Sequence, residues 1–219
     1  MKRLVRVSYN IDEGTPLYPK TEPIIIKQAK SILRGDSCNT YVISLSNHTG
    51  THIDFPNHFH NSGRKVADYT VEELIFKKPL VLDCPKGQDE PIRTSDLKGR
   101  VKKTTDLLLI RTGFFKLRGR KVYISRNPYI LPETAKWLKT SCPRLRAIGI
   151  DCISVASPLH RQEGRNTHRA LLGGKNPILI IEDVDLSMRL KGLKEVIAVP
   201  LYMEGIDSSP CTLIGVIDA

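Results

Sequence analysis

The chain has 219 residues, a formal net charge of +11 and five cysteines. This length is enough for one large domain with its own core, and no Gly/Ser-rich or Pro-rich linker divides the sequence, so we expect a single domain over residues 1–219. The basic charge leaves nucleic-acid binding open as an alternative, but no helix-turn-helix, RNA-recognition or zinc-finger signature accompanies it.

Two features of the sequence bear on the cell compartment. Residues 1–7 include basic side chains, but no long apolar stretch follows them as it would in a secretory signal, and no apolar segment is long enough to span a membrane. The cysteines are widely spaced and include no Cys-x-x-Cys pair, which argues against a disulfide framework or a zinc ribbon. We therefore expect a cytoplasmic protein without a membrane segment and with buried thiols. A nucleophilic Cys152 is the alternative.

Strand-like and helical segments follow one another along the chain. The alternation of apolar and polar residues over Tyr41–Ser46 predicts a strand. Helices are predicted over Val71–Lys77 and over Pro132–Lys139, where the proline suits a first helical turn. Six further apolar runs predict strands, over residues 79–84, 106–112, 146–151, 177–181, 195–200 and 211–217. This pattern implies an α/β fold, with a mixed β-sheet or a partly closed barrel and helices packed outside it.

Basic residues concentrate between Arg111 and Arg126, where Phe114, Phe115 and Tyr123 are interleaved with them. Such a stretch fits a surface that contacts phosphate groups, and it also fits a solvated loop. Because no nucleic-acid-binding signature accompanies the stretch, we favour the loop and do not expect nucleic acid as the partner.

The histidines are the most unevenly distributed residues of the chain. All six fall in two short windows, and four of them lie between His48 and His60. These four and the aspartate among them occupy even positions, and in an extended chain such residues point to the same side. Gly50 and Thr51 are poor helix formers, and Pro56 favours extended backbone at the residue before it. We therefore expect a strand that runs into an extended loop whose polar side chains converge.

A metal site is the simplest explanation of this histidine cluster. Imidazole is a common metal ligand and a proton carrier near neutral pH, and Asp54 adds a carboxylate in the same register. Any single histidine taken alone is more often an ordinary core or surface residue, and His60 is the one we expect to be incidental. The cluster as a whole favours a metal site that is also catalytic.

The second window contains His160 and His168. The segment after His168 leads through a glycine-rich turn to an apolar run that ends in Glu182. A carboxylate at the exit of a buried strand is costly to bury without a partner, and a bound cation is one resolution. An exposed acidic loop is the other, because Asp183 and Asp185 follow closely.

The eleven residues from His48 to His58 resemble the His-x-Gly-Thr-His-x-Asp-x-Pro-x-His signature of the cyclase family of metal-dependent hydrolases. This family includes bacterial kynurenine formamidases (arylformamidases) and the related isatin hydrolases. The resemblance implies a single-domain, swivelling β/β/α fold with a compact mixed sheet or barrel, assembled as a homodimer or homotetramer. Further segments that resemble the family are Gly14–Pro19, Leu109–Gly113, Ile148–Val155, His168–Leu172, Ile180–Glu182, Val199–Leu201 and Ser209–Pro210.

The resemblance also implies roles for individual residues. Asp54 and Glu182 fall where a carboxylate can be shared between two ions, and His58 falls on a catalytic histidine that is not itself a ligand. Tyr18 falls near a substrate-contacting aromatic residue, which is tryptophan in typical kynurenine formamidases. His160 has no counterpart among the ligands. The metal-ligand positions of the family are occupied here by His48, His52, Asp54, His168 and Glu182.

The chemistry follows from these ligands, which suit one or two Zn²⁺ or Mn²⁺ ions. The pKa of water bound to such an ion falls to about 7, and the ion polarises the carbonyl group under attack. His58 can then take up a proton and deliver it to the leaving nitrogen. We predict a hydrolase that cleaves an amide-type C–N bond of a small molecule, either an aryl formamide such as N-formylkynurenine or a cyclic amide. The alternative is a metal-binding family member without hydrolase activity.

Overall fold

A nine-stranded mixed sheet forms the centre of the computed structural model, which describes residues 2–218. Strand β1 pairs with β13, and the two ends of the sheet approach each other where β12 contacts β6, so the sheet is nearly closed into a barrel. The strands along the sheet are β5 (Ile75–Phe76), β12 (Leu193–Pro200), β13 (Ser208–Asp218), β4 (His52–Asp54), β11 (Leu179–Glu182), β10 (Ala147–Ile150), β8 (Leu107–Arg111) and β6 (Pro79–Asp83), with β1 over Lys2–Arg6.

The central strands of the sheet consist of uninterrupted apolar residues, so both faces of the sheet are buried against apolar cores. In β8, Leu107 and Leu109 point to the core inside the barrel, whereas Leu108 and Ile110 point to the core under the helices. Parallel strands covered on both faces have this composition. Strands β6, β8, β10 and β11 are parallel, and the remaining strands of the sheet pair antiparallel.

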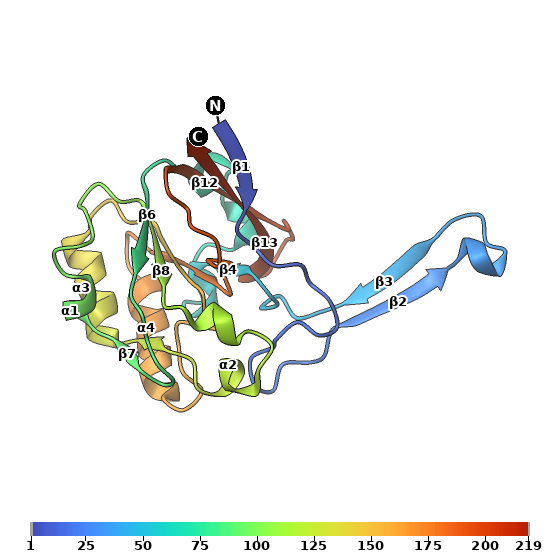
Figure 1. The fold of residues 1–219 in the computed structure, drawn as a ribbon, viewed down its shortest axis with the longest axis horizontal. Helices are drawn as coiled ribbons and strands as arrows, with labels where there is room; N and C mark the ends of the chain where they lie inside the picture. The colour runs from blue at the N-terminus through green and yellow to red at the C-terminus, as the bar shows by residue number, and fades with distance from the viewer. Residues whose placement is uncertain (1, 219) are drawn as a thin grey trace.

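Two longer helices, α3 (Pro132–Ser141) and α4 (Arg161–Leu172), pack against each other and cover one face of the sheet (Figure 1). Helix α4 lies next to β11 and supplies Leu171 and Leu172 to the core on this face. The shorter elements are α1 (Thr94–Leu97), α2 (Lys121–Ser125), the paired strands β7 (Pro91–Ile92) and β9 (Tyr129–Ile130), and 3-10 helices over Ile32–Arg34, Pro56–His58, Val66–Asp68, Glu72–Leu74 and Phe114–Leu117.

A two-stranded hairpin, β2 (Ile25–Lys30) and β3 (Thr40–Ser44), projects far from the rest of the molecule (Figure 1). We call residues 25–44 the arm. An isolated two-stranded hairpin buries little of its own surface. Accordingly, the arm leaves large apolar side chains exposed on both of its faces and at its tip, namely Ile25, Ile32, Leu33, Tyr41, Val42 and Ile43.

The fold confirms the expected α/β class, with a mixed sheet nearly closed into a barrel. Each of the six apolar runs overlaps an observed strand, and the helix predicted at residues 132–139 is confirmed as α3. The helix predicted over Val71–Lys77 is wrong. Residues 72–74 form a single 3-10 turn, and Ile75 and Phe76 then pair with β12 as strand β5. Pairing with the edge of the sheet overrides the local helical preference of this short segment.

The basic stretch from Arg111 to Arg126 is only in part the solvated loop that we expected, because Lys116, Arg120, Lys121 and Arg126 are exposed but the segment is partly helical and partly buried. It contains the 3-10 helix over residues 114–117 and helix α2, and it buries Phe114 and Tyr123. Arg118 forms an ion pair at 2.7 Å with the fully buried Asp183. The stretch therefore packs against the core, and Arg118 forms its ion pair with Asp183 there.

Among residues 2–218, no helix has the length and apolar character needed to cross a membrane.

Candidate metal centre

The short strand β4 brings the two main segments of the site together. On one side, β4 pairs with β11, and His52 lies directly opposite Glu182. On the other side, β4 pairs with β13, and Asp54 lies opposite Ser208. Ile53 points into the barrel core, so His52 and Asp54 share the opposite face, as the alternation of side chains along a strand requires.

His52 is held with one ring nitrogen facing the carboxylates. Its Nδ1 lies 2.8 Å from the carbonyl oxygen of Gly50, and because a carbonyl only accepts, Nδ1 carries the proton. Nε2 then lies 3.4 Å from Oε2 of Glu182 and 3.5 Å from Oδ1 of Asp54. Gly50 has a φ of +61°, and a Cβ atom there would lie 3.1 Å from Ile11, so this backbone position suits glycine.

Helix α4 presents His168 to the same carboxylates in the same way. Nδ1 of His168 donates to the carbonyl oxygen of Gly164 at 2.8 Å, one turn earlier in the helix. Nε2 is thereby directed at Oε1 of Glu182, 3.6 Å away, and at Oδ2 of Asp54, 4.0 Å away. Fixing one histidine nitrogen by a carbonyl and leaving the other free is the usual arrangement around protein-bound metals.

Glu182 is buried and its orientation is fixed by the segment that follows β10. Oε1 accepts hydrogen bonds of 2.8 Å from the hydroxyl of Ser154 and from the backbone N–H of Val155. The alternative of an exposed acidic loop is therefore excluded for Glu182. It is also excluded for Asp183, which is fully buried and bound by Arg118.

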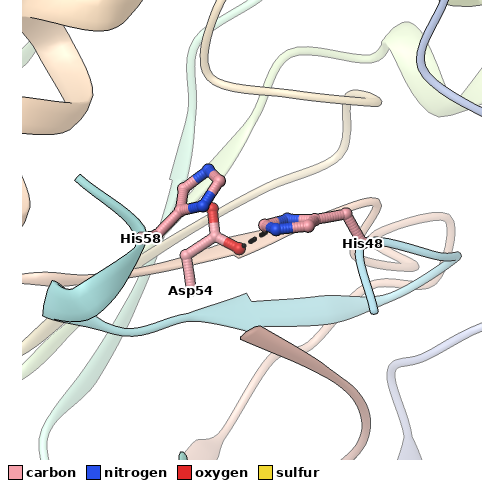
Figure 2. A group of neighbouring side chains, drawn as sticks. All are labelled: His48, Asp54 and His58. Carbon is pink, nitrogen blue, oxygen red and sulfur yellow. Dashed lines mark ion pairs between the residues drawn. The ribbon is translucent and has the colours of Figure 1, made fainter. Parts of the chain in front are cut away.

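His48 and His58 complete the cluster from the two loops that flank β4. Figure 2 shows the Asp54 carboxylate directed toward the rings of His48 and His58. Nδ1 of His48 lies 3.1 Å from Oδ1 of Asp54. A further carboxylate, Asp207, joins the two rings from the segment before β13. Its Oδ2 lies 2.6 Å from Nδ1 of His58 and 3.4 Å from Nε2 of His48.

The electrostatics of the cluster follow from burial and from these contacts. Burial lowers the pKa of His48, but the charges of Asp54 and Asp207 outweigh it and raise that pKa to about 10. Burial opposes the charged form of Asp54 as well, but the imidazoles of His48 and His52 hold its pKa well below the usual range. The carboxylates are therefore ionised at neutral pH, which is the state that binds a cation.

The cluster fits a metal ion because buried polar atoms in it lack hydrogen-bond partners. Both carboxylate oxygens of Asp54 and Nε2 of His52 are buried without a hydrogen bond, since the contacts described above lack hydrogen-bond geometry. Leaving such atoms unsatisfied is costly, and a cation among them removes the cost. Candidate ligand atoms within 4.8 Å of one another form two groups, His48–Asp54–His58 and His52–Asp54–Glu182, and Asp54 belongs to both.

The cluster lies in a cavity of about 410 Å³. Tyr18, Phe59 and Ile153 provide apolar lining, and the Tyr18 side chain packs against the core under the helices. The residue predicted to contact substrate therefore lines the cavity that contains the predicted ligands.

The structure brings together every residue predicted for the metal site and for catalysis. It places His60, His160 and Cys152 away from the carboxylates of the cluster. His60 donates to the carbonyl oxygen of Arg169, and His160 contacts Asp89 at 3.1 Å, so neither faces the carboxylates of the cluster. Cys152 is fully buried, and burial raises the pKa of its thiol well above the usual value, which removes the thiolate that a nucleophile needs.

Sequence reasoning missed Asp207 and Ser154. Asp207 lies 149 positions from His58, and nothing in its neighbourhood distinguishes it from an exposed turn residue. Ser154 lies within one of the segments that resemble the cyclase family, but no role was assigned to it. Ser154 lies four residues after Ile150, where the apolar run ends, and no local pattern distinguishes it from its neighbours.

The comparisons with known proteins agree with this geometry. The family model named Cyclase matches residues 5–157, which include the whole segment from His48 to His58. The chain belongs to the cyclase family. The matched range ends before His168 and Glu182, so these two residues rest on the geometry described above.

Relatives of this cyclase-family protein include a kynurenine formamidase from Geobacillus thermodenitrificans, which is 34% identical over 96% of this chain and 95% of its own length. Among solved structures, an isatin hydrolase bound to a product analogue superposes with a TM-score of 0.84 at 18% identity, covering 100% of this chain and 93% of its own. A protein from Bacillus stearothermophilus described as a predicted metal-dependent hydrolase superposes with a TM-score of 0.79 at 22% identity, covering 99% of this chain and 98% of its own. These two similarities show the shared fold.

Proposed function

We propose that this cyclase-family protein is a metal-dependent hydrolase that cleaves a non-peptide, amide-type C–N bond of a small molecule. The environment of the Asp54 carboxylate is the main support for this function. Both of its oxygens are buried without hydrogen bonds, and the imidazoles of His48, His52 and His168 approach them to between 3.1 and 4.0 Å. A carboxylate in this position is suited to bind cations on both sides.

The ligands that we assign to the metal centre are His48, His52, Asp54, His168 and Glu182. Imidazole nitrogens and carboxylate oxygens without a thiolate suit Zn²⁺ or Mn²⁺, and the sharing of Asp54 by the two groups of ligand atoms supports room for two ions. Such a cation, when bound, supplies a Lewis acid for the carbonyl and activates water for attack.

His58 and Asp207 supply proton transfer. The Asp207 carboxylate accepts the Nδ1 proton of His58 at 2.6 Å, which fixes the tautomer and leaves Nε2 without a proton. Nε2 can then take a proton from the attacking water and give it to the leaving nitrogen, which must be protonated to depart as an amine. Asp207 also stabilises the imidazolium formed in between.

We infer that the substrate is an aryl formamide, such as N-formylkynurenine, or a cyclic amide. The names of the similar proteins, kynurenine formamidase and isatin hydrolase, support these two classes. Tyr18 and Phe59 line the cavity and suit contact with an aromatic ring. We assign the substrate-contacting role to Tyr18, and its place in the cavity lining supports this assignment.

Hydrolysis with and without metal tests the proposal. Protein purified without chelator, and the same protein after chelation and after reloading with Zn²⁺ or Mn²⁺, is assayed on formanilide, N-formylkynurenine and isatin. We expect hydrolysis of at least one compound, loss after chelation, and recovery with one of the two metals. If the metal-loaded protein hydrolyses none of these compounds, the hydrolase proposal is wrong and the protein is a metal-binding family member without this activity.

A further inference from the structure

Three basic side chains, Lys20, Arg161 and Arg165, line the cavity that contains the metal cluster. All three are exposed, whereas Asp54 and Glu182 in the same cavity are buried. The basic groups therefore form the open end of the cavity, and the carboxylates form its inner end.

The two arginines share one face of helix α4 with a proposed metal ligand. Arg161, Arg165 and His168 are spaced by four and three residues, which places them on the same side of a helix. With a rise of 1.5 Å per residue, Arg165 lies about 4.5 Å and Arg161 about 10.5 Å along the helix axis from His168. Gly164 allows this face to approach the cavity wall, because a Cβ atom there would lie 2.5 Å from Cβ of Ala156.

None of the three side chains has a partner within residues 2–218. No ion pair or side-chain hydrogen bond joins Lys20, Arg161 or Arg165 to another described residue. In contrast, Arg64 and Arg118 elsewhere in the molecule pair with carboxylates. Asp54 and Glu182, the two acidic residues among those that line the cavity, belong to the metal cluster. A bound cation neutralises that pair, and the open end of the cavity then carries an uncompensated positive charge.

Lys20 adds a second observation, because its backbone is in a conformation that L-residues rarely adopt. Its φ is +76°, at a turn in which the N–H of Thr21 donates to the carbonyl oxygen of Tyr18. Glycine would adopt this conformation without strain, and strained residues concentrate at functional sites. A lysine at this position keeps a cation beside Tyr18, the residue that we expect to contact the substrate.

From this arrangement we propose that the substrate carries an anionic group, a carboxylate in the simplest case, opposite the bond that is cleaved. Arg161, Arg165 and Lys20 hold that group at the open end of the cavity while the amide lies at the metal cluster. This inference rests on the proposed hydrolase function and narrows its substrate class to aryl amides with a negative charge.

The test compares formanilide with 4-formamidobenzoate, which share the ring and the formamide and differ by one carboxylate. We expect the wild type to have the higher kcat/KM for 4-formamidobenzoate, and the double variant Arg161→Gln/Arg165→Gln to lower the ratio of the two kcat/KM values by roughly tenfold. Raising the salt concentration should also lower the ratio of the two kcat/KM values in the wild type, because salt screens the attraction between the carboxylate and the basic side chains. Arg169→Gln, which removes one positive charge from the same helix outside the cavity lining, is the control and should keep the ratio, and each single variant, Arg161→Gln or Arg165→Gln, matches it in charge.

Binding gives a readout that does not depend on turnover. If neither compound is hydrolysed, the hydrolase function fails, and calorimetric titration of both compounds into the metal-loaded protein still decides the charge proposal. We then expect tighter binding of 4-formamidobenzoate, reduced in the double variant and retained in Arg169→Gln. The proposal would be overturned if the wild type bound or hydrolysed the two compounds equally well. It would also be overturned if the double variant left the ratio of their Kd or kcat/KM values unchanged.

Discussion

Nδ1 of His58 lies 2.6 Å from Oδ2 of Asp207, although 149 positions separate the two residues in the chain. The two segments meet because β4 and β13 are paired, which places Asp54 opposite Ser208 and brings the flanking residues alongside each other. Strand pairing thus joins a histidine from the His48–His58 signature to a carboxylate that no local motif indicates.

The first prediction separates proton transfer by His58 from metal binding. His58→Ala should retain bound metal and lose hydrolytic rate, mainly in kcat, by roughly 10²–10⁴-fold, because proton transfer acts in the transition state. Elemental analysis and steady-state kinetics check the two parts. Loss of metal in this variant would make His58 a ligand, as its place in one group of candidate ligand atoms allows.

Asp207→Asn is the companion variant for the same dyad. An amide can no longer stabilise the imidazolium, so kcat should fall while KM changes little, and Asp207→Glu should recover part of the rate. A decrease confined to KM would show that Asp207 acts on substrate binding instead.

The second prediction distinguishes the two histidines of the second window. His168→Ala should lower metal content and thermal stability, because Nε2 of His168 faces Glu182 and Asp54. His160→Ala is the matched control, since its imidazole contacts Asp89 away from the cluster. The ligand assignment is wrong if the His160 variant loses metal and the His168 variant keeps it.

The third prediction concerns the arm as a contact between copies of the chain. The homodimer or homotetramer expected from the sequence stays a prediction. Val42 and Ile43 are 60% and 59% exposed on opposite faces of the arm, and burying them against a second copy would remove apolar surface from water. Light scattering should give a multiple of 24.6 kDa for the wild type. The double variant Val42→Lys/Ile43→Lys should be monomeric, and Val71→Lys, an exposed apolar site outside the arm, should not. A monomeric wild type would contradict this.

The fourth prediction is a pH dependence of stability away from the metal centre. The hydrogen bonds from Arg64 lower the pKa of Glu73 to about 2, from 4.5. Because the folded-state pKa is lowered, the stabilisation is present above pH 4.5 and is lost as the pH falls toward 2. Both side chains are well exposed, so the effect should stay below about 1 kcal/mol. Urea unfolding should show a difference between wild type and Arg64→Gln at pH 6 that shrinks at pH 3. A difference independent of pH would argue against the pair.

The sequence predicted the parts of the site that are close together in the chain. The alternation of His52, Ile53 and Asp54 is visible locally, and so is the burial of a strand that ends in Glu182. The start of helix α4 was not predictable in the same way. The residue before it, His160, makes no side-chain capping hydrogen bond, and Gly164 interrupts the helical pattern.

Long-range pairing explains the remaining differences. Residues 75–76 become a strand only because β12 lies beside them, and Tyr41–Ser46 is confirmed as a strand that belongs to the arm and not to the main sheet. An alternating pattern predicts one buried face, and within residues 2–218 β3 has none.

We propose that Asp54 binds the metal on which hydrolysis depends, and elemental analysis of Asp54→Asn is the sharpest test of this assignment. Wild-type protein purified without chelator should contain one or two divalent ions per chain. Metal at 100 times its Kd should stabilise the folded protein by about 2.7 kcal/mol. Asp54→Asn should lose the metal and that stabilisation, while Asp83→Asn, an exposed aspartate outside the site, should keep both. Full metal content in Asp54→Asn would contradict the account.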